Sequence, residues 1–173
     1  MRATATLLLA FALVAANGCN EPKPEPEPEN AAPDLVLNNV DGSGTVSLAE
    51  QQGKVVLVDL WATWCVPCIA ELPHLQAMSE ELAPDDFLML GIVLESGERE
   101  KIVDFLAEKK ITYTQVMGEQ ETAEAFGPFL GYPTKYLVDR DGLVVKRYFG
   151  IVGEELRADV ETLMRTGVLD SDD

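Results

Sequence analysis

Two cysteines separated by two residues are the part of this chain best suited to chemistry. Cys65 and Cys68 stand in the run Trp64-Cys65-Val66-Pro67-Cys68, directly after an apolar segment. Two thiols at this spacing can close into a disulfide and reopen, and a thiolate of such a pair can attack a disulfide of another molecule. The spacing therefore predicts thiol-disulfide exchange.

The segments on either side of the pair predict a strand followed by a helix. Residues 54–60 (KVVLVDL) form a nearly continuous apolar run, typical of a central strand buried on both faces, and residues 69–82 carry apolar side chains at helical spacing. Cys65 is thus expected at a helix N-terminus, where free N–H groups and the helix dipole stabilise a thiolate. We expect Cys65 to be the nucleophile and the more enclosed Cys68 to attack the resulting mixed disulfide, while Pro67 fits the first helical turn.

With these residues in view, the chain resembles the thioredoxin superfamily, and WATWCVPC is most similar to the membrane-tethered TlpA/ResA-type thiol-disulfide oxidoreductases. The similarity runs from about residue 33 to residue 165 and includes Pro73 and the run Gly131-Tyr132-Pro133-Thr134. It implies a thioredoxin-like α/β fold: a central mixed sheet flanked by helices, with an N-terminal β-hairpin and a helical insertion before a cis-proline.

The resemblance also implies roles for residues around the cysteines. Pro133 is the expected cis-proline beside the disulfide, and Tyr132 would present its backbone to an extended substrate segment. The expected substrate surface consists of Trp64, Pro67, Tyr132 and Thr134. Aromatic side chains beside a strand end commonly pack, so we expect Trp61 to be mostly buried and Trp64 partly exposed.

Two carboxylates are further candidates. Asp59 matches the buried aspartate of thioredoxins, which is thought to take the proton of the second cysteine through water, although many TlpA/ResA-like chains carry asparagine there. A carboxyl group in so apolar a strand should be desolvated and its pKa raised; the alternative is a local hydrogen-bonding role. Glu95 resembles a glutamate that ResA-type proteins place near the active site, and the alternative is a solvated residue at a strand end.

The N-terminal residues predict export and anchoring. Residues 1–18 have one basic residue, Arg2, and an apolar stretch too short to span a bilayer, as in a signal peptide. Ala16-Asn17-Gly18-Cys19 resembles a bacterial lipobox, which makes Cys19 the expected lipidation site, although Ala16 departs from the usual larger aliphatic residue. A plain cleaved signal and an uncleaved anchor are the alternatives. We therefore expect an extracytoplasmic protein in the bacterial periplasm or cell envelope, anchored to the membrane at Cys19.

Composition divides the rest of the chain. Residues 19–33 are rich in proline and glutamate and predict an extended tether, with a ligand for a proline-binding module as the alternative; residues 34–167 suit one thioredoxin-like domain, and 168–173 form an acidic tail. The formal net charge of −17 argues against nucleic acid as a partner. We expect a monomer whose partners are protein disulfide or dithiol clients and a membrane thiol electron donor.

Further patterns predict the remaining elements. A hairpin is expected from residues 35–37 and 45–48, a strand at 87–94, helices at 99–108 and 121–126, a second hairpin at 135–138 and 143–148, and a closing helix at 154–165. No glycine-rich phosphate loop appears, so we expect no cofactor. His74 is the only histidine, and it is expected to point away from the cysteines, so no metal is predicted.

Two functions remain after this reading. The favoured one is an enzyme that reduces disulfides in envelope proteins, apocytochrome c being one example of a client. The alternative is a copper or thiol chaperone on the same fold. The C-x-x-C spacing with proline inside favours the enzyme.

Overall fold

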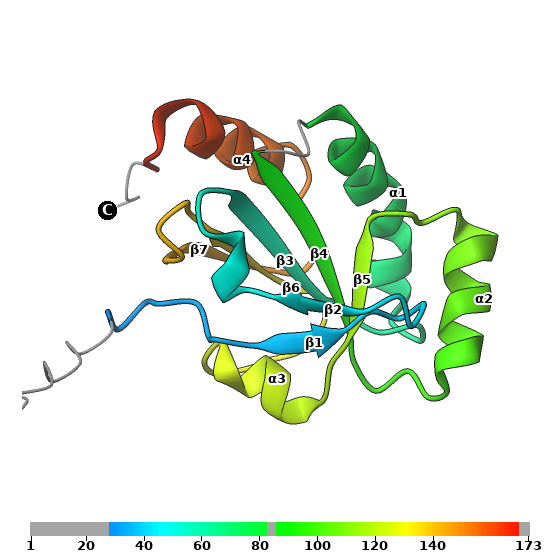
Figure 1. Cartoon of the computed structure of the whole chain (residues 1–173). Coiled ribbons are helices and arrows are strands. Elements are labelled where there is room, and N and C mark those ends of the chain that lie inside the picture. Colours follow the sequence, from blue (N-terminus) through cyan, green and yellow to red (C-terminus); the bar gives the residue numbers. More distant parts are fainter. Residues whose placement is uncertain (1–27, 83–85, 170–173) are drawn as a thin grey trace, which may run out of the picture.

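A mixed five-stranded sheet forms the centre of the computed structural model, which describes residues 28–82 and 86–169 (Figure 1). Its strands are β3 (Val55–Trp61), β4 (Phe87–Val93), β5 (Thr114–Met117), β6 (Thr134–Val138) and β7 (Val144–Phe149). They lie in the order β5-β4-β3-β6-β7, with β3, β4 and β5 parallel and β6 and β7 each antiparallel to the preceding strand in that order. β3 is therefore the middle strand.

Helices cover both faces of this sheet. The helices are α1 (Val66–Glu81), α2 (Arg99–Lys109), α3 (Gln120–Ala125) and α4 (Glu154–Thr166). Apolar residues of α1, α2 and α4 share one core cluster with Leu57 and Trp61, whereas Ala123 of α3 belongs to the cluster on the opposite face, with Val58 and Leu60. Successive side chains of β3 point to opposite faces of the sheet, and both faces are covered by helices, so all residues of β3 are buried.

The N-terminal hairpin packs beside this core. β1 (Val36–Asn38) pairs with β2 (Thr45–Ser47), followed by a short 3-10 helix, η1 (Ala49–Gln51). Ahead of it, Ala32 N–H donates to the Gly142 carbonyl at 2.8 Å, and Val144 N–H donates to the Asn30 carbonyl at 2.8 Å. These bonds attach residues 30–32 to β7 and to the turn that precedes it.

The predicted elements are present with small shifts at their ends, and the expected fold class is confirmed. α1 begins at Val66, with Cys65 as its N-cap and Pro67 in its first turn, as the sequence predicted. The one strand that the sequence did not predict is β5. It is short, contains Thr114 and Gln115, and lies at the edge of the sheet, where its pairing with β4 rather than an apolar pattern defines it.

Several predictions concern the ends of the chain. The predicted signal peptide, the predicted lipidation site Cys19, most of the predicted tether and residues 170–173 lie outside the described residues. Among the residues that are described, no helix is both long and apolar enough to cross a membrane.

Candidate active site

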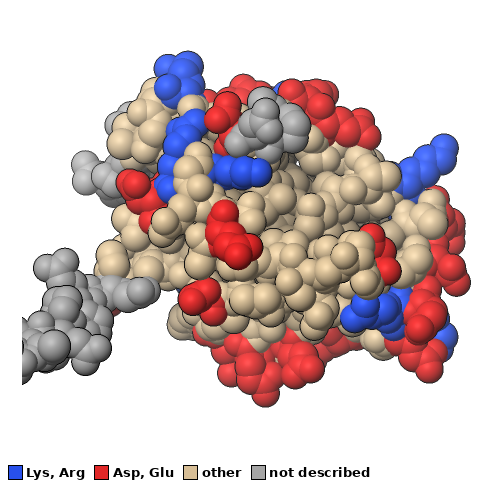
Figure 2. Space-filling model, in the orientation of Figure 1, with Lys and Arg blue, Asp and Glu red and all other residues tan. Residues whose placement is uncertain are grey.

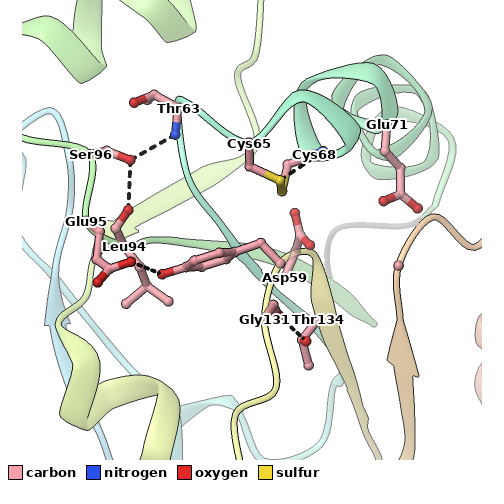
Figure 3. The surroundings of a disulfide bond; sticks show 12 residues. Asp59, Thr63, Cys65, Cys68, Glu71, Leu94, Glu95, Ser96, Gly131 and Thr134 are labelled. Carbon is pink, nitrogen blue, oxygen red and sulfur yellow. Dashed lines mark hydrogen bonds between the residues drawn. A yellow bond between two sulfur atoms is a disulfide. The ribbon is translucent and has the colours of Figure 1, made fainter.

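The two cysteines are joined in a disulfide at the N-terminus of α1 (Figure 3). Cys65 is the N-cap residue, and its Sγ accepts a hydrogen bond from the Cys68 N–H at 3.2 Å. Pro67 lies in the first turn, as expected, and both cysteines are buried while Val66 between them is exposed. The expected difference in enclosure is small in this oxidised form, since 4% of Cys65 and 2% of Cys68 are exposed.

The loop before β6 supplies the second part of the site. The Tyr132–Pro133 peptide bond is cis, as the resemblance implied, and Pro133 is buried. The Thr134 hydroxyl donates to the Gly131 carbonyl at 2.6 Å (Figure 3). This bond ties the two ends of the loop together, so Thr134 stabilises the loop and is itself fully buried.

Trp64 and Tyr132 form an aromatic surface that joins the cysteine segment to the cis-proline loop. Their rings meet edge to face with centroids 5.3 Å apart, and 57% of Trp64 is exposed. Trp61, in contrast, is fully buried, and its Nε1 donates to Gln115 Oε1 at 2.9 Å. The expected division between the two tryptophans is confirmed.

Glu95 holds this aromatic surface from a third loop. Tyr132 Oη donates to Glu95 Oε2 at 3.0 Å, and Trp64 Nε1 donates to the Glu95 carbonyl at 2.9 Å. Burial raises the pKa of the Tyr132 phenol, and the adjacent Glu95 carboxylate raises it further. Glu95 has a φ of 46°, a left-handed backbone that is uncommon outside glycine. The residue is exposed and braces two loops of the site through hydrogen bonds.

Behind the disulfide lie three buried charged side chains. Asp59 of β3 is 2% exposed, Glu71 of α1 is 4% exposed, and Lys135 of β6 is fully buried. Lys135 Nζ donates to Glu71 Oε2 at 2.6 Å and lies 3.6 Å from Asp59 Oδ1. In the view of Figure 3, the Asp59 carboxylate lies directly below the disulfide, and Glu71 lies to its right, on the side away from Glu95.

Burial dominates the electrostatics of Asp59. It raises the pKa of this carboxyl to about 6; the Lys135 charge lowers the value, and the Glu71 charge raises it. Since this pKa lies near neutral pH, Asp59 is able to exchange a proton under physiological conditions. The raised pKa agrees with the expectation from the apolar strand.

Glu71 and Lys135 are the site residues that sequence reasoning missed. Two signals pointed to them. Glu71 stands one helical turn after Cys68, on the same helix face, and Lys135 is a lone cation in the apolar run TKYLV of β6, in which every residue is buried. A charge in such a strand requires a partner, because burying an unpaired ammonium group is very costly.

His74 does not join this site. It is exposed on α1, and within the described part of the chain no group of three or more His, Cys, Asp or Glu residues is arranged to hold a metal ion.

A cysteine pair at a helix N-terminus, a neighbouring cis-proline and a central mixed sheet together define a thioredoxin-like thiol-disulfide oxidoreductase. The chain belongs to the AhpC/TSA family, whose model matches residues 28–147. Thiol-disulfide oxidoreductase ResA of Geobacillus thermodenitrificans is 31% identical over 162 residues, which cover 90% of this chain and 89% of that protein.

Solved structures agree with this assignment. A thiol:disulfide interchange protein of the thioredoxin family from Chlorobium tepidum superposes with a TM-score of 0.71 at 25% identity, covering 81% of this chain and 99% of that one. The fold is shared as well with a secreted thiol-disulfide isomerase from Corynebacterium glutamicum, with a TM-score of 0.69 at 23% identity, covering 77% of this chain and 84% of that one. The protein is a thiol-disulfide oxidoreductase with ResA-type relatives.

Proposed function

We propose that this protein reduces disulfides in client proteins outside the cytoplasm and is itself re-reduced by a dithiol donor in the membrane. The observation that carries the proposal is the disulfide at the α1 N-terminus beside the exposed Trp64 and the half-buried Tyr132, with an ionisable carboxyl, Asp59, buried behind it. An exposed aromatic surface suits an unfolded or extended protein segment, and the buried carboxyl suits proton transfer.

The reaction begins from the reduced protein. The Cys65 thiolate attacks one sulfur of a client disulfide; a bond forms between Cys65 and the client, and the other client sulfur leaves as a thiolate. Cys68 then gives its proton to Asp59 and attacks Cys65 Sγ, which closes the intramolecular disulfide and releases the second client sulfur. Two electrons pass to the client, and a membrane dithiol must return two electrons to the Cys65–Cys68 disulfide before the next cycle.

The surface around the pair offers the client a defined set of contacts. Trp64 and Val66 are exposed beside the cysteines, and Leu130 is exposed just before the cis-proline loop. In the proposed complex, Pro67 borders the bound segment and Tyr132 aligns it through its backbone, while the buried Thr134 holds the loop in shape from beneath. Glu95 acts by holding Tyr132 and Trp64 in place.

The location follows from the N-terminal sequence. Lipidation of Cys19 would anchor the protein, and the residues of the predicted 19–33 tether that precede the folded part would act as a spacer between membrane and domain. A secreted relative with the same fold supports this location. Acidic side chains gather over α3 on the face shown in Figure 2, and they give no electrostatic attraction to anionic lipid, so the anchor supplies the membrane attachment.

The deciding measurement is the reduction potential of the Cys65–Cys68 pair in a soluble fragment that begins at residue 28. The fragment is equilibrated in thiol redox buffers and read by the mass shift on alkylation. We expect a potential well below the glutathione range, together with faster reduction of an oxidised model protein than oxidation of a reduced one. A potential well above that range would instead indicate an oxidase or isomerase.

A further inference from the structure

The buried charges behind the disulfide are arranged by the register of the sheet. Asp59 and Lys135 stand directly opposite each other in the antiparallel pair of β3 and β6, so their side chains lie on the same face. Leu57 and Trp61, two residues away on either side of Asp59, belong to the core under α1, and Glu71 reaches this face from α1 itself. Lys135 is thus enclosed between a strand and a helix that each contribute one carboxylate.

The two carboxylates are held very differently. Glu71 accepts the 2.6 Å hydrogen bond of Lys135 Nζ through Oε2, and its Oε1 accepts from the Val152 N–H at 3.1 Å. Asp59 Oδ1 is 3.6 Å from Lys135 Nζ, beyond hydrogen-bond range, and has no hydrogen-bond partner in the structure. Both carboxylate oxygens of Glu71 accept a hydrogen bond. Asp59 is attracted electrostatically by the Lys135 ammonium group, but its Oδ1 accepts no hydrogen bond and is available to receive a proton.

The other groups around Lys135 do not replace its pairing with Glu71 and Asp59. Its neighbour on β7 is Tyr148, whose hydroxyl donates to Asp159 at 2.6 Å. The remaining contact of Lys135 Nζ is the Gly150 carbonyl at 3.4 Å. On the β5 side of Asp59 lies Tyr113; burial raises the pKa of its phenol, and the Asp59 charge adds to the rise. Lys135 is therefore the cation that balances the two carboxylates.

We propose that Lys135 is a positioning residue for the proton transfer: fixed by Glu71, its ammonium group keeps the Asp59 carboxylate charged and ready to accept the proton of Cys68. Without this cation, two carboxylates would share a dry site, and one would take up a proton at neutral pH. Asp59, which has fewer hydrogen bonds than Glu71, would be the one protonated. The proposal rests on the proton-accepting role given to Asp59 above.

The test compares the pH dependence of disulfide reduction in the wild type and in Lys135→Met, using an oxidised model protein as substrate. The variant should move the rising limb of the pH–rate curve up by at least one pH unit, with at least about a twofold lower rate at pH 7 and recovery at alkaline pH. Lys146→Met is the matched control. Lys146 is on the neighbouring strand β7, partly exposed, and also pairs with two carboxylates, Glu155 and Asp159, so its loss should leave the curve in place.

Two further variants separate positioning from a structural role. The double variant Glu71→Gln/Lys135→Met removes one charge of each sign. Its pH–rate curve should lie between those of Lys135→Met and the wild type, because Asp59 no longer faces a second carboxylate. In an Asp59→Asn background, Lys135→Met should cause no further shift. An unshifted curve in folded Lys135→Met, or an equal shift in the Asp59→Asn background, would overturn the proposal.

A measurement without any client keeps this proposal distinct from the proposed function. Carbon-13 NMR follows the Asp59 carboxyl directly through its titration, and Lys135→Met should raise the titration midpoint by at least one pH unit. If the wild type fails to reduce the model protein but this midpoint moves, the proposed function fails and the electrostatic role of Lys135 stands. An unmoved midpoint contradicts the role of Lys135 whatever the activity.

Discussion

At the scale of single residues, the site depends on which charges are buried and which are exposed. Asp59 is a carboxyl group placed where water is excluded, whereas Glu95 is exposed and accepts a hydrogen bond from Tyr132. The same kind of side chain thus has a proposed role in proton exchange in one position and braces two loops in the other. Burial decides between them, because it penalises the charged form and brings the pKa of Asp59 near neutrality.

The raised pKa of Asp59 has a consequence for stability. The folded protein holds the Asp59 proton up to about pH 6, whereas the unfolded chain holds it only up to about pH 3.8. The contribution of Asp59 to the free energy of unfolding is therefore fully present below pH 3.8 and is lost as pH rises through 6. Two pKa units correspond to about 3 kcal/mol. Asp59→Asn should therefore raise the free energy of unfolding of the oxidised protein at pH 8 by about 2 kcal/mol, and the gain should shrink towards pH 4.

Urea unfolding at pH 4, 6 and 8 checks this expectation. Asp41→Asn provides a control of opposite sign, since hydrogen bonds from Ser43 lower the pKa of the exposed Asp41 carboxyl. A gain for Asp59→Asn that does not depend on pH would show that ionisation is not its cause.

At the scale of elements, strand register brings the site together. One row of residues crosses all five strands at the level of Asp59: Gln115, Gly91, Asp59, Lys135 and Tyr148. Gly91 is the member without a side chain, and the Gln115 amide fills the space above it. That amide in turn accepts the Trp61 hydrogen bond at 2.9 Å, so edge strand β5 supports the segment that leads into the cysteines.

Gly91→Ala should disrupt this arrangement. The added Cβ would lie 2.2 Å from Gln115 Oε1, so the amide must move and break its bond with Trp61. We expect a loss of about 1–3 kcal/mol in the free energy of unfolding. Gln115→Ala alone should cost a similar amount by leaving Trp61 Nε1 unpaired, and the double variant should cost clearly less than the sum.

Chemical denaturation of the four proteins tests the coupling. Gly153→Ala is a suitable control, because an added Cβ there meets no atom within 4 Å. Additive losses at Gly91 and Gln115 would contradict the packing argument.

At the scale of the whole molecule, the domain is strongly acidic, and the N-terminal segment is the proposed site of membrane attachment. The net charge of −17 favours solubility and repels anionic surfaces. The folded part is tied down from Asn30 onward by hydrogen bonds to the edge of β7. Attachment to a membrane is therefore expected to depend on residues ahead of the domain and not on its surface.

Replacement of Cys19 tests this division. If Cys19 carries the lipid, Cys19→Ser should move the protein from the membrane fraction to the soluble extracytoplasmic fraction, while the rate of disulfide reduction by the purified protein stays unchanged. Fractionation with immunodetection measures the first effect and a turnover assay the second. A variant that stays in the membrane would indicate an uncleaved anchor, and a soluble wild type would indicate a plain cleaved signal.

The sequence by itself determined the chemistry and most of the architecture. Cys65, Cys68 and the strand-to-helix junction around them are local features, because helix position and thiol spacing follow from neighbouring residues. Asp59 was also recognisable, since a carboxyl in a continuous apolar strand must be desolvated. The strand and helix predictions succeeded for the same reason, as each rests on a periodic pattern within one segment.

Only the tertiary structure decided which charged groups lie next to the Asp59 carboxylate. Lys135 lies 76 residues further along the chain, and Glu71 is on a helix, so their meeting depends on antiparallel register between β3 and β6 and on the packing of α1 over that row. The edge strand β5 was missed because sheet pairing, rather than any apolar pattern of its own, defines it. Long-range pairing of this kind depends on contacts between distant segments, and these contacts set the charge balance behind the cysteines.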